Sequence, residues 1–91
     1  MDQNRAELMA IGALGWLADN DLLDAFMNAS GADHDTIRAA AGQPEFLGSV
    51  LDFVLMDDEW VRGVCDAQGL PYEQLLRARM ALPGGDLPHW T

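Results

Sequence analysis

Residues 45–56 read EFLGSVLDFVLM, a stretch in which apolar side chains recur at the spacing of one helical face. Its apolar face comprises Phe46, Leu47, Val50, Leu51, Val54 and Leu55. The rest of the chain lacks the alternating β-branched runs that predict strands, and Ala, Leu, Met and Arg are plentiful. The sequence therefore predicts an all-α fold.

A similar pattern occurs earlier in the chain. When residues 8–41 are laid over residues 46–79, thirty-eight positions further on, apolar residues coincide at fourteen sites. About eight coincidences would arise by chance at this apolar content, so the excess indicates an internal repeat. We expect one domain, residues 1–91, folded as a compact bundle of about six short helices. Two pseudo-repeated three-helix units would pack their apolar faces together, followed by a C-terminal tail at residues 83–91.

Capping residues predict where the helices begin and end. Gly31 and Gly69 match in the two halves and are expected to end the second and fifth helices, since glycine readily adopts a left-handed conformation. Asp33 is the expected N-cap of the third helix, and Asp19 or Asn20 that of the second. The predicted helices span about residues 5–18, 20–31, 33–41, 45–56, 58–67 and 71–82.

Charge is the unusual property of the composition. Fifteen Asp and Glu stand against five Arg and no Lys, which gives a net charge of −10 and a pI near 4.1. Such a surface repels phosphate backbones and anionic lipids, so we expect neither direct nucleic-acid binding nor membrane binding. Cys65 is the single cysteine, which excludes an internal disulfide and fits a cytoplasmic location; we expect a buried structural thiol. We predict no signal peptide, because residues 8–18 are not preceded by a basic segment.

Two acidic clusters were considered as cation sites. The first contains Asp19, Asp21 and Asp24, and the second spans residues 57–59. Neither has the glycine and terminal glutamate of a calcium-binding loop, whereas acidic residues at a helix start cap free amides and oppose the helix dipole. We interpret both clusters as capping residues. No zinc spacing, phosphate loop or nucleophile motif is present, so we expect no metal, no cofactor and no enzymatic activity.

The first helix carries apolar residues on a second face. Ile11, Leu14 and Ala18 form this extra stripe, and their counterparts in the second half are mostly polar. We expect the C-terminal tail, with Trp90, to cover the stripe. A homodimer contact or a helix of a partner protein is the alternative.

Three arginines, Arg38, Arg77 and Arg79, fall near equivalent places in the predicted third and sixth helices. Arginine near a helix C-terminus complements the dipole. Ion pairs between these arginines and the acidic clusters of the other half are the alternative interpretation, and an arginine patch that binds an acidic ligand is a third, disfavoured by the negative surroundings.

Four stretches carry a resemblance to a known family: residues 45–55, the acidic residues 57–59, ALGWLA at 13–18 and RARMALPGG at 77–85. Together they resemble a family of short alphaproteobacterial proteins, the domain of unknown function 3572. The resemblance implies a small bacterial cytoplasmic protein. It implies no activity and no catalytic or binding residues.

From the sequence we expect a small acidic interaction or regulatory module that binds a basic or amphipathic segment of an unknown protein, as a monomer or homodimer. Two alternatives stay open: a nucleic-acid mimic that occupies the DNA-binding face of a regulator, and a small enzyme with a concave site. The expected contact residues are Ile11, Leu14 and Trp90, surrounded by Asp19, Asp21 and Asp24.

Overall fold

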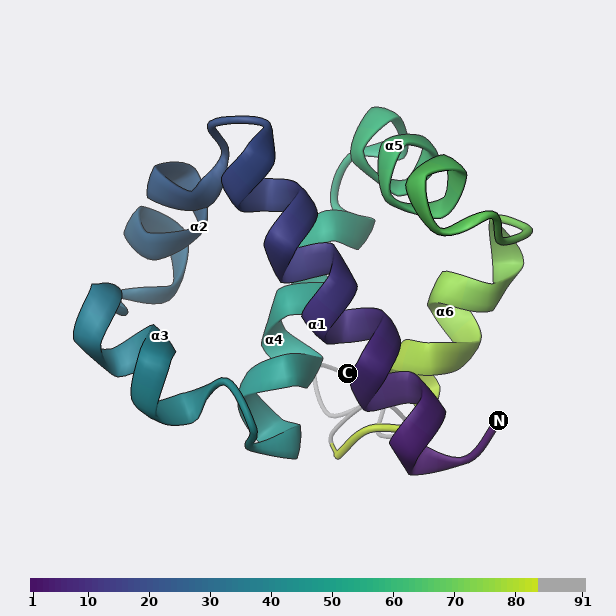
Figure 1. The fold of residues 1–91 in the computed structure, drawn as a ribbon, viewed down its shortest axis with the longest axis horizontal. Coiled ribbons are helices and arrows are strands. Elements are labelled where there is room, and N and C mark those ends of the chain that lie inside the picture. The colour runs from purple at the N-terminus through teal and green to yellow at the C-terminus, as the bar shows by residue number, and fades with distance from the viewer. Residues whose placement is uncertain (84–91) are drawn as a thin grey trace, which may run out of the picture.

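Six α-helices form the fold in the computed structural model, which describes residues 1–83. They are α1 (Gln3–Asp19), α2 (Leu23–Ser30), α3 (His34–Ala40), α4 (Pro44–Leu55), α5 (Asp58–Gln68) and α6 (Glu73–Met80). Residues 1–83 contain no strand, so the prediction of an all-α bundle is confirmed. α1 and α4 cross at the centre, with α2 and α3 on one side and α5 and α6 on the other (Figure 1).

Helix α1 is the central element and packs on α2, α4, α5 and α6. Its buried face carries Ala6, Ala10 and Ala13, which are fully buried and small enough to let the neighbouring helices approach closely. The larger buried residues of α1 are Met9 and Leu17. From helical spacing, Leu8 would be expected on the same buried face as Met9 and Leu17, but its side chain is 70% exposed. The tightly packed alanine face, rather than the bulkiest residues, therefore points into the core.

Four aromatic residues connect the two sides of the bundle through α4. Phe26 of α2 meets Phe46 and Phe53 of α4 edge to face, with ring centroids 5.8 and 5.4 Å apart. Phe53 in turn stacks on Trp60 of α5 at 4.8 Å. Such pairs contribute about 0.5–1.5 kcal/mol each beyond the burial of their area, so this chain of rings ties α2, α4 and α5 together.

Several helix ends form as their capping residues predict. Gly31 and Gly69 adopt left-handed conformations, with φ of 77° and 68°, directly after α2 and α5. Asp33 precedes α3, and its carboxylate accepts a hydrogen bond from the Thr36 backbone N–H at 2.8 Å. This bond stabilises the charged form and lowers the pKa of Asp33. The predicted stops and the predicted cap of α3 are therefore confirmed.

Two glycines allow side chains to cross between α1 and α5. The Gln68 amide donates to the Met9 carbonyl at 3.2 Å and lies over Gly12, where a Cβ would come within 2.6 Å of the amide nitrogen. In the other direction, the Trp16 indole of α1 lies over Gly63 of α5, where a Cβ would overlap the ring. Both contacts depend on the missing side chain.

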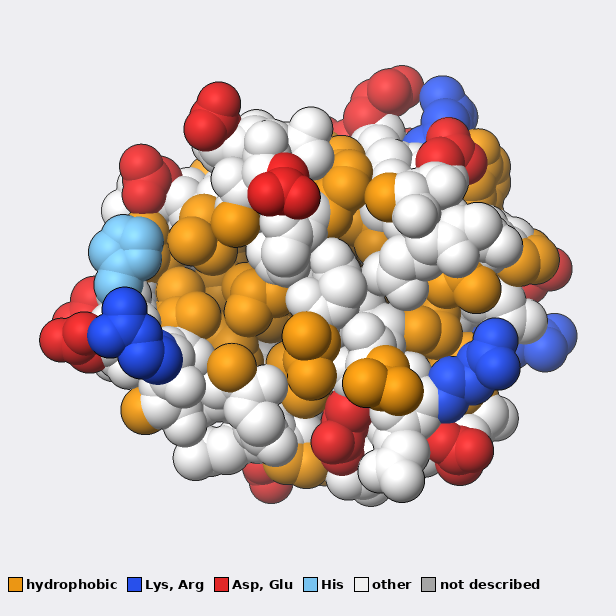
Figure 2. Space-filling model, in the orientation of Figure 1, with side chains coloured by type: hydrophobic (Ala, Val, Ile, Leu, Met, Phe, Trp, Pro, Cys, Tyr) orange, Lys and Arg blue, Asp and Glu red, His pale blue; other side chains and the backbone are white. Residues whose placement is uncertain are grey.

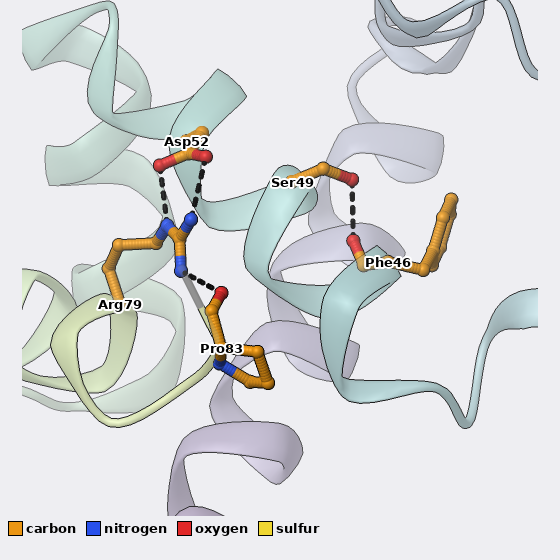
Figure 3. A network of polar contacts seen from close by, with 5 residues as sticks. All are labelled: Phe46, Ser49, Asp52, Arg79 and Pro83. Atoms are coloured by element: carbon orange, nitrogen blue, oxygen red, sulfur yellow. Dashed lines mark hydrogen bonds and ion pairs between the residues drawn. The ribbon is translucent and has the colours of Figure 1, made fainter. Parts of the chain in front are cut away.

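Arg79 connects α6 to α4 (Figure 3). Its guanidinium donates to both carboxylate oxygens of Asp52, at 2.5 and 3.0 Å, and to the Pro83 carbonyl at 3.0 Å. The alternative interpretation of ion pairs between an acidic cluster and the other half is wrong for Arg79, because Asp52 lies in the same half and outside both clusters. Arg38 makes only an exposed contact of 3.9 Å with Asp35, one turn away on α3.

Cys65 is fully buried in α5. Burial raises the pKa of its thiol, since the thiolate would lose its hydration there. The prediction of a buried structural cysteine is confirmed, and the thiol is neutral at physiological pH.

Candidate functional site

The first acidic cluster does not begin a helix. Asp19 is the last residue of α1, and the backbone and side-chain amides of Asn20 both donate to the Trp16 carbonyl. Helix α2 starts only at Leu23, without a side-chain cap. The prediction that Asp19 or Asn20 caps α2 is therefore wrong, because the Asn20 side chain donates back to a carbonyl in the last turn of α1 and α2 starts three residues beyond it.

Asp21 has the one positive φ, 59°, among the non-glycine residues of the described chain. Its N–H faces the Ala18 carbonyl at 3.4 Å, and the next residue, Leu22, donates to the Leu17 carbonyl at 2.8 Å. This pair of bonds is the Schellman motif, in which glycine usually occupies the left-handed position. An aspartate therefore stands where the backbone favours glycine.

Electrostatics do not favour this arrangement either. Asp19 lies at the negative end of the α1 dipole, and the last turn of α1 has no basic residue. Asp21 and Asp24 are also exposed, and none of the three forms an ion pair within residues 1–83. Only Asp24, in the first turn of α2, has a position that the helix dipole favours. The helix dipole thus explains one of the three carboxylates, and capping explains none of them.

The carboxylates adjoin the extra apolar stripe of α1. Ile11 is 47% exposed, Leu14 is half-buried against the core, and Ala18 continues the same helical face. Ala18 also lines a small hollow of about 120 Å³ together with Asp21, Leu23 and Asp24. Figure 2 shows acidic side chains along the edge of an apolar, hollowed area between α1 and the α2–α3 pair.

We call this region the α1–α2 surface. The structure brings two of the six predicted contact residues, Asp21 and Asp24, to one hollow, while Leu14 and Ile11 lie on the same helical face as Ala18, one and two turns earlier. Asp19 follows Ala18 in the chain, and Trp90 lies outside the described residues. The α1–α2 surface comprises Ile11, Leu14, Ala18, Asp19, Asp21, Leu23 and Asp24.

A second hollow lies between α2 and α4 and was not predicted from the sequence. It has a volume of about 180 Å³, and the rings of Phe26 and Phe53 contribute to its lining. Three of its lining residues, Ala29 and Ser30 of α2 and Ser49 of α4, have small side chains, which leaves space between the two helices. The α2–α4 hollow, as we call it, is lined by Phe26, Ala29, Ser30, Ser49, Asp52, Phe53 and Met56. No single stretch of sequence signals it, because its lining comes from two helices that are distant in the chain.

Comparison with known proteins identifies the domain. Residues 3–85 match the family described as "Protein of unknown function (DUF3572)". The chain belongs to the DUF3572 family. No curated protein and no solved structure matches it. The matched range contains all six helices, so the bundle is the DUF3572 domain.

The described part of this DUF3572 protein contains no group of three or more His, Cys, Asp or Glu side chains arranged to hold a metal ion. Its helices within residues 1–83 are each too short or too polar to cross a membrane. Besides Asp33 and Cys65, Tyr72 has a shifted pKa, raised first by burial and then by Asp66, whose carboxylate accepts its hydroxyl at 3.2 Å. These three groups line neither hollow.

Proposed function

We propose that this DUF3572 protein is a bacterial, cytoplasmic interaction module that binds a basic, amphipathic segment of another protein and catalyses no reaction. The observation that carries the proposal is the position of Asp19 and Asp21. Each stands where its local structure favours a different residue, a cation at the end of α1 and a glycine in the left-handed turn. Residues that break a local rule without a compensating contact are expected at functional sites.

The α1–α2 surface has the two properties that an amphipathic helix requires of its binding site. Ile11 and Leu14 offer apolar area along one side of α1. Asp21 and Asp24 line a small hollow next to Ala18, at the end of this stripe, into which a lysine or arginine can direct its charge. Apolar side chains of the partner would supply affinity, and its cations would supply orientation and a fast, salt-dependent association.

A designed peptide tests the proposal without knowledge of the natural partner. The probe is a helical Leu/Lys peptide with one apolar and one basic face, and its affinity is measured by fluorescence anisotropy at low and moderate salt. The test variant is Asp19→Asn/Asp21→Asn/Asp24→Asn. The matched control, Asp35→Asn/Glu45→Gln/Glu73→Gln, removes three exposed carboxylates from the first turns of α3, α4 and α6.

We expect the test variant to bind the peptide about tenfold more weakly, the equivalent of 1.4 kcal/mol, and the control to bind like the wild type. Ile11→Asp should weaken binding similarly, because it places a charge in the apolar stripe. If the test variant and the control weakened binding equally, the peptide would be attracted only by the net charge of −10 and by no particular site. The proposal would then fail.

A further inference from the structure

Helix α6 presents an apolar stripe to solvent. Its buried side carries Leu75 and Ala78 and packs on α1 and α4. Its solvent side carries Tyr72, Leu76 and Met80, which are 47%, 53% and 56% exposed. Residues spaced by four lie one above another on a helix, so these three form a continuous stripe, which we call the α6 stripe. Single exposed apolar residues are ordinary, whereas a contiguous patch indicates an interaction site.

The charges beside the α6 stripe lie along one edge of it. Glu73 and Arg77 each follow a stripe residue by one position, so both fall on the same flank, one turn apart. Both are exposed, and neither forms an ion pair within residues 1–83. On the other flank, Arg79 is bound to Asp52 of α4. The exposed surface of α6 therefore combines apolar area with one negative and one positive charge on a single edge.

This edge is complementary to itself when two copies of α6 run antiparallel. A two-fold axis that makes the helices antiparallel brings their charged edges to the same side of the contact, whereas parallel helices would have them on opposite sides. Glu73 of one copy would then face Arg77 of the partner subunit, and the two-fold axis would repeat the pair. The dipoles of two antiparallel helices also attract each other. The charges of α6 thus match those of a second copy of the same chain.

We propose that the protein forms a two-fold dimer in which the α6 stripes of two copies pack antiparallel, with Glu73 and Arg77 paired across the axis. The stripe supplies the contact area, and the ion pairs fix its register. A contact through one helix is small, in the class below about 1,200 Å² that forms weak and transient complexes, so the dimer depends on protein concentration.

The proposed dimer is independent of the proposed function and compatible with it. Helix α6 lies on the side of α1 away from α2, so each copy keeps its α1–α2 surface open (Figure 1). The two interactions also respond oppositely to salt. Two copies that each carry a net charge of −10 repel each other, and salt screens this repulsion, so the dimer should strengthen as salt is added. Binding of the basic peptide should weaken under the same conditions.

Sedimentation velocity of the full chain, over a wide range of concentrations and at low and moderate salt, tests the dimer. Leu76→Asp places a charge in the middle of the stripe and should weaken the dimer at least about tenfold. The matched control is Leu8→Asp, the same change at a leucine of α1 that is 70% exposed, and it should dimerise like the wild type.

Exchange of the charges tests the antiparallel register. Glu73→Arg and Arg77→Glu each place like charges opposite each other at both contacts, so each variant alone should dimerise about tenfold more weakly. In an equimolar mixture, each variant meets the opposite charges of the other at both contacts, and a heterodimer of wild-type affinity should form. Its formation would also show that both variants are folded.

Four results would overturn the proposal. The first is a wild type that stays monomeric at every concentration, and the second is a mixture of the two charge variants that does not associate. The third is a dimer that Ile11→Asp dissociates and Leu76→Asp does not, because the contact would then lie on α1. The fourth is a dimer that weakens as salt is added, because oppositely charged surfaces would then hold the copies together.

Discussion

The acidic runs at residues 19–21 and 57–59 occupy opposite ends of helices. In the second run, Asp57 stands before α5 and its carboxylate accepts from the Glu59 backbone N–H at 2.8 Å, while Asp58 and Glu59 lie in the first turn. All three charges face the positive end of a dipole. The first run closes α1: one aspartate faces the negative end of the dipole, and another takes a left-handed conformation.

This difference shows which carboxylates stabilise the helices and which do not. Removal of the Asp57 carboxylate would leave the Glu59 amide at the start of α5 without its acceptor. Removal of the carboxylates at residues 19 and 21 would take no described hydrogen bond or ion pair from the fold. The run at residues 57–59 thus stabilises a helix, whereas the run at residues 19–21, as we propose, serves recognition.

The largest expected effect is that of Asp57→Ala, which removes the cap of α5. We expect the free energy of unfolding to fall by about 1 kcal/mol, within a range of about 0.5–2. In a domain of this size the melting temperature should fall by about 4–8 °C per kcal/mol, measured by calorimetry. Asp57→Ser keeps an acceptor and should recover most of the loss. A comparable loss for Asp19→Ala would contradict the distinction between the two runs.

Asp21→Gly should stabilise the protein, since glycine adopts the left-handed conformation without strain. We expect a gain of about 0.5–1 kcal/mol in urea denaturation, partly offset by the greater freedom of glycine in the unfolded chain. Asp24→Gly is the control, because it places glycine inside the first turn of α2 and should destabilise. If Asp21→Gly were destabilising, the turn would depend on a contact of Asp21 that we have not identified.

A smaller gain is expected from Asp19→Lys, which places a cation at the C-terminal end of α1. The dipole interaction should contribute about 0.3–0.5 kcal/mol at low salt, and the gain should diminish as salt is added. The same variant should weaken binding of the basic peptide. Stabilisation combined with weaker binding would be direct evidence that Asp19 opposes stability and serves recognition.

The smallest effect concerns Asp33, which caps α3 as Asp57 caps α5. Because its folded pKa is lowered, its contribution is fully present above the unfolded value of about 3.9 and is lost as the pH falls through the folded pKa. Urea denaturation between pH 5 and 2, as an approximate window, should therefore show a shallower loss of stability in Asp33→Asn than in the wild type. Parallel curves for the two proteins would show that ionisation of this cap has no effect.

Local chemistry made part of this fold predictable. Gly31, Gly69 and Asp33 act through neighbours within a few residues, so their roles could be predicted from the sequence. The end of α1 could not, because Asn20 could cap either helix and only the folded chain shows which carbonyl its side chain meets. The pseudo-repeat of the two halves stays a prediction.

Of the two candidate sites, one could be proposed from the sequence and the other could not. Five predicted contact residues are close in sequence, on α1, the turn after it and the first turn of α2, so helical spacing could propose them as a group. The α2–α4 hollow depends on small residues of two helices that meet only in the folded protein, and sequence spacing does not reveal it. The pairing of Arg79 with Asp52, 27 residues apart, likewise depends on the packing of α6 against α4.

The guanidinium of Arg79 has a consequence for the whole charge distribution. Its side chain is only 12% exposed, and its planar fork binds a carboxylate and a main-chain carbonyl together, which a lysine could not reproduce. The protein has five arginines and commits this one to a pair with Asp52, so four remain to offset the other fourteen carboxylates. Any positively charged molecule nearby therefore meets an almost uniformly negative particle.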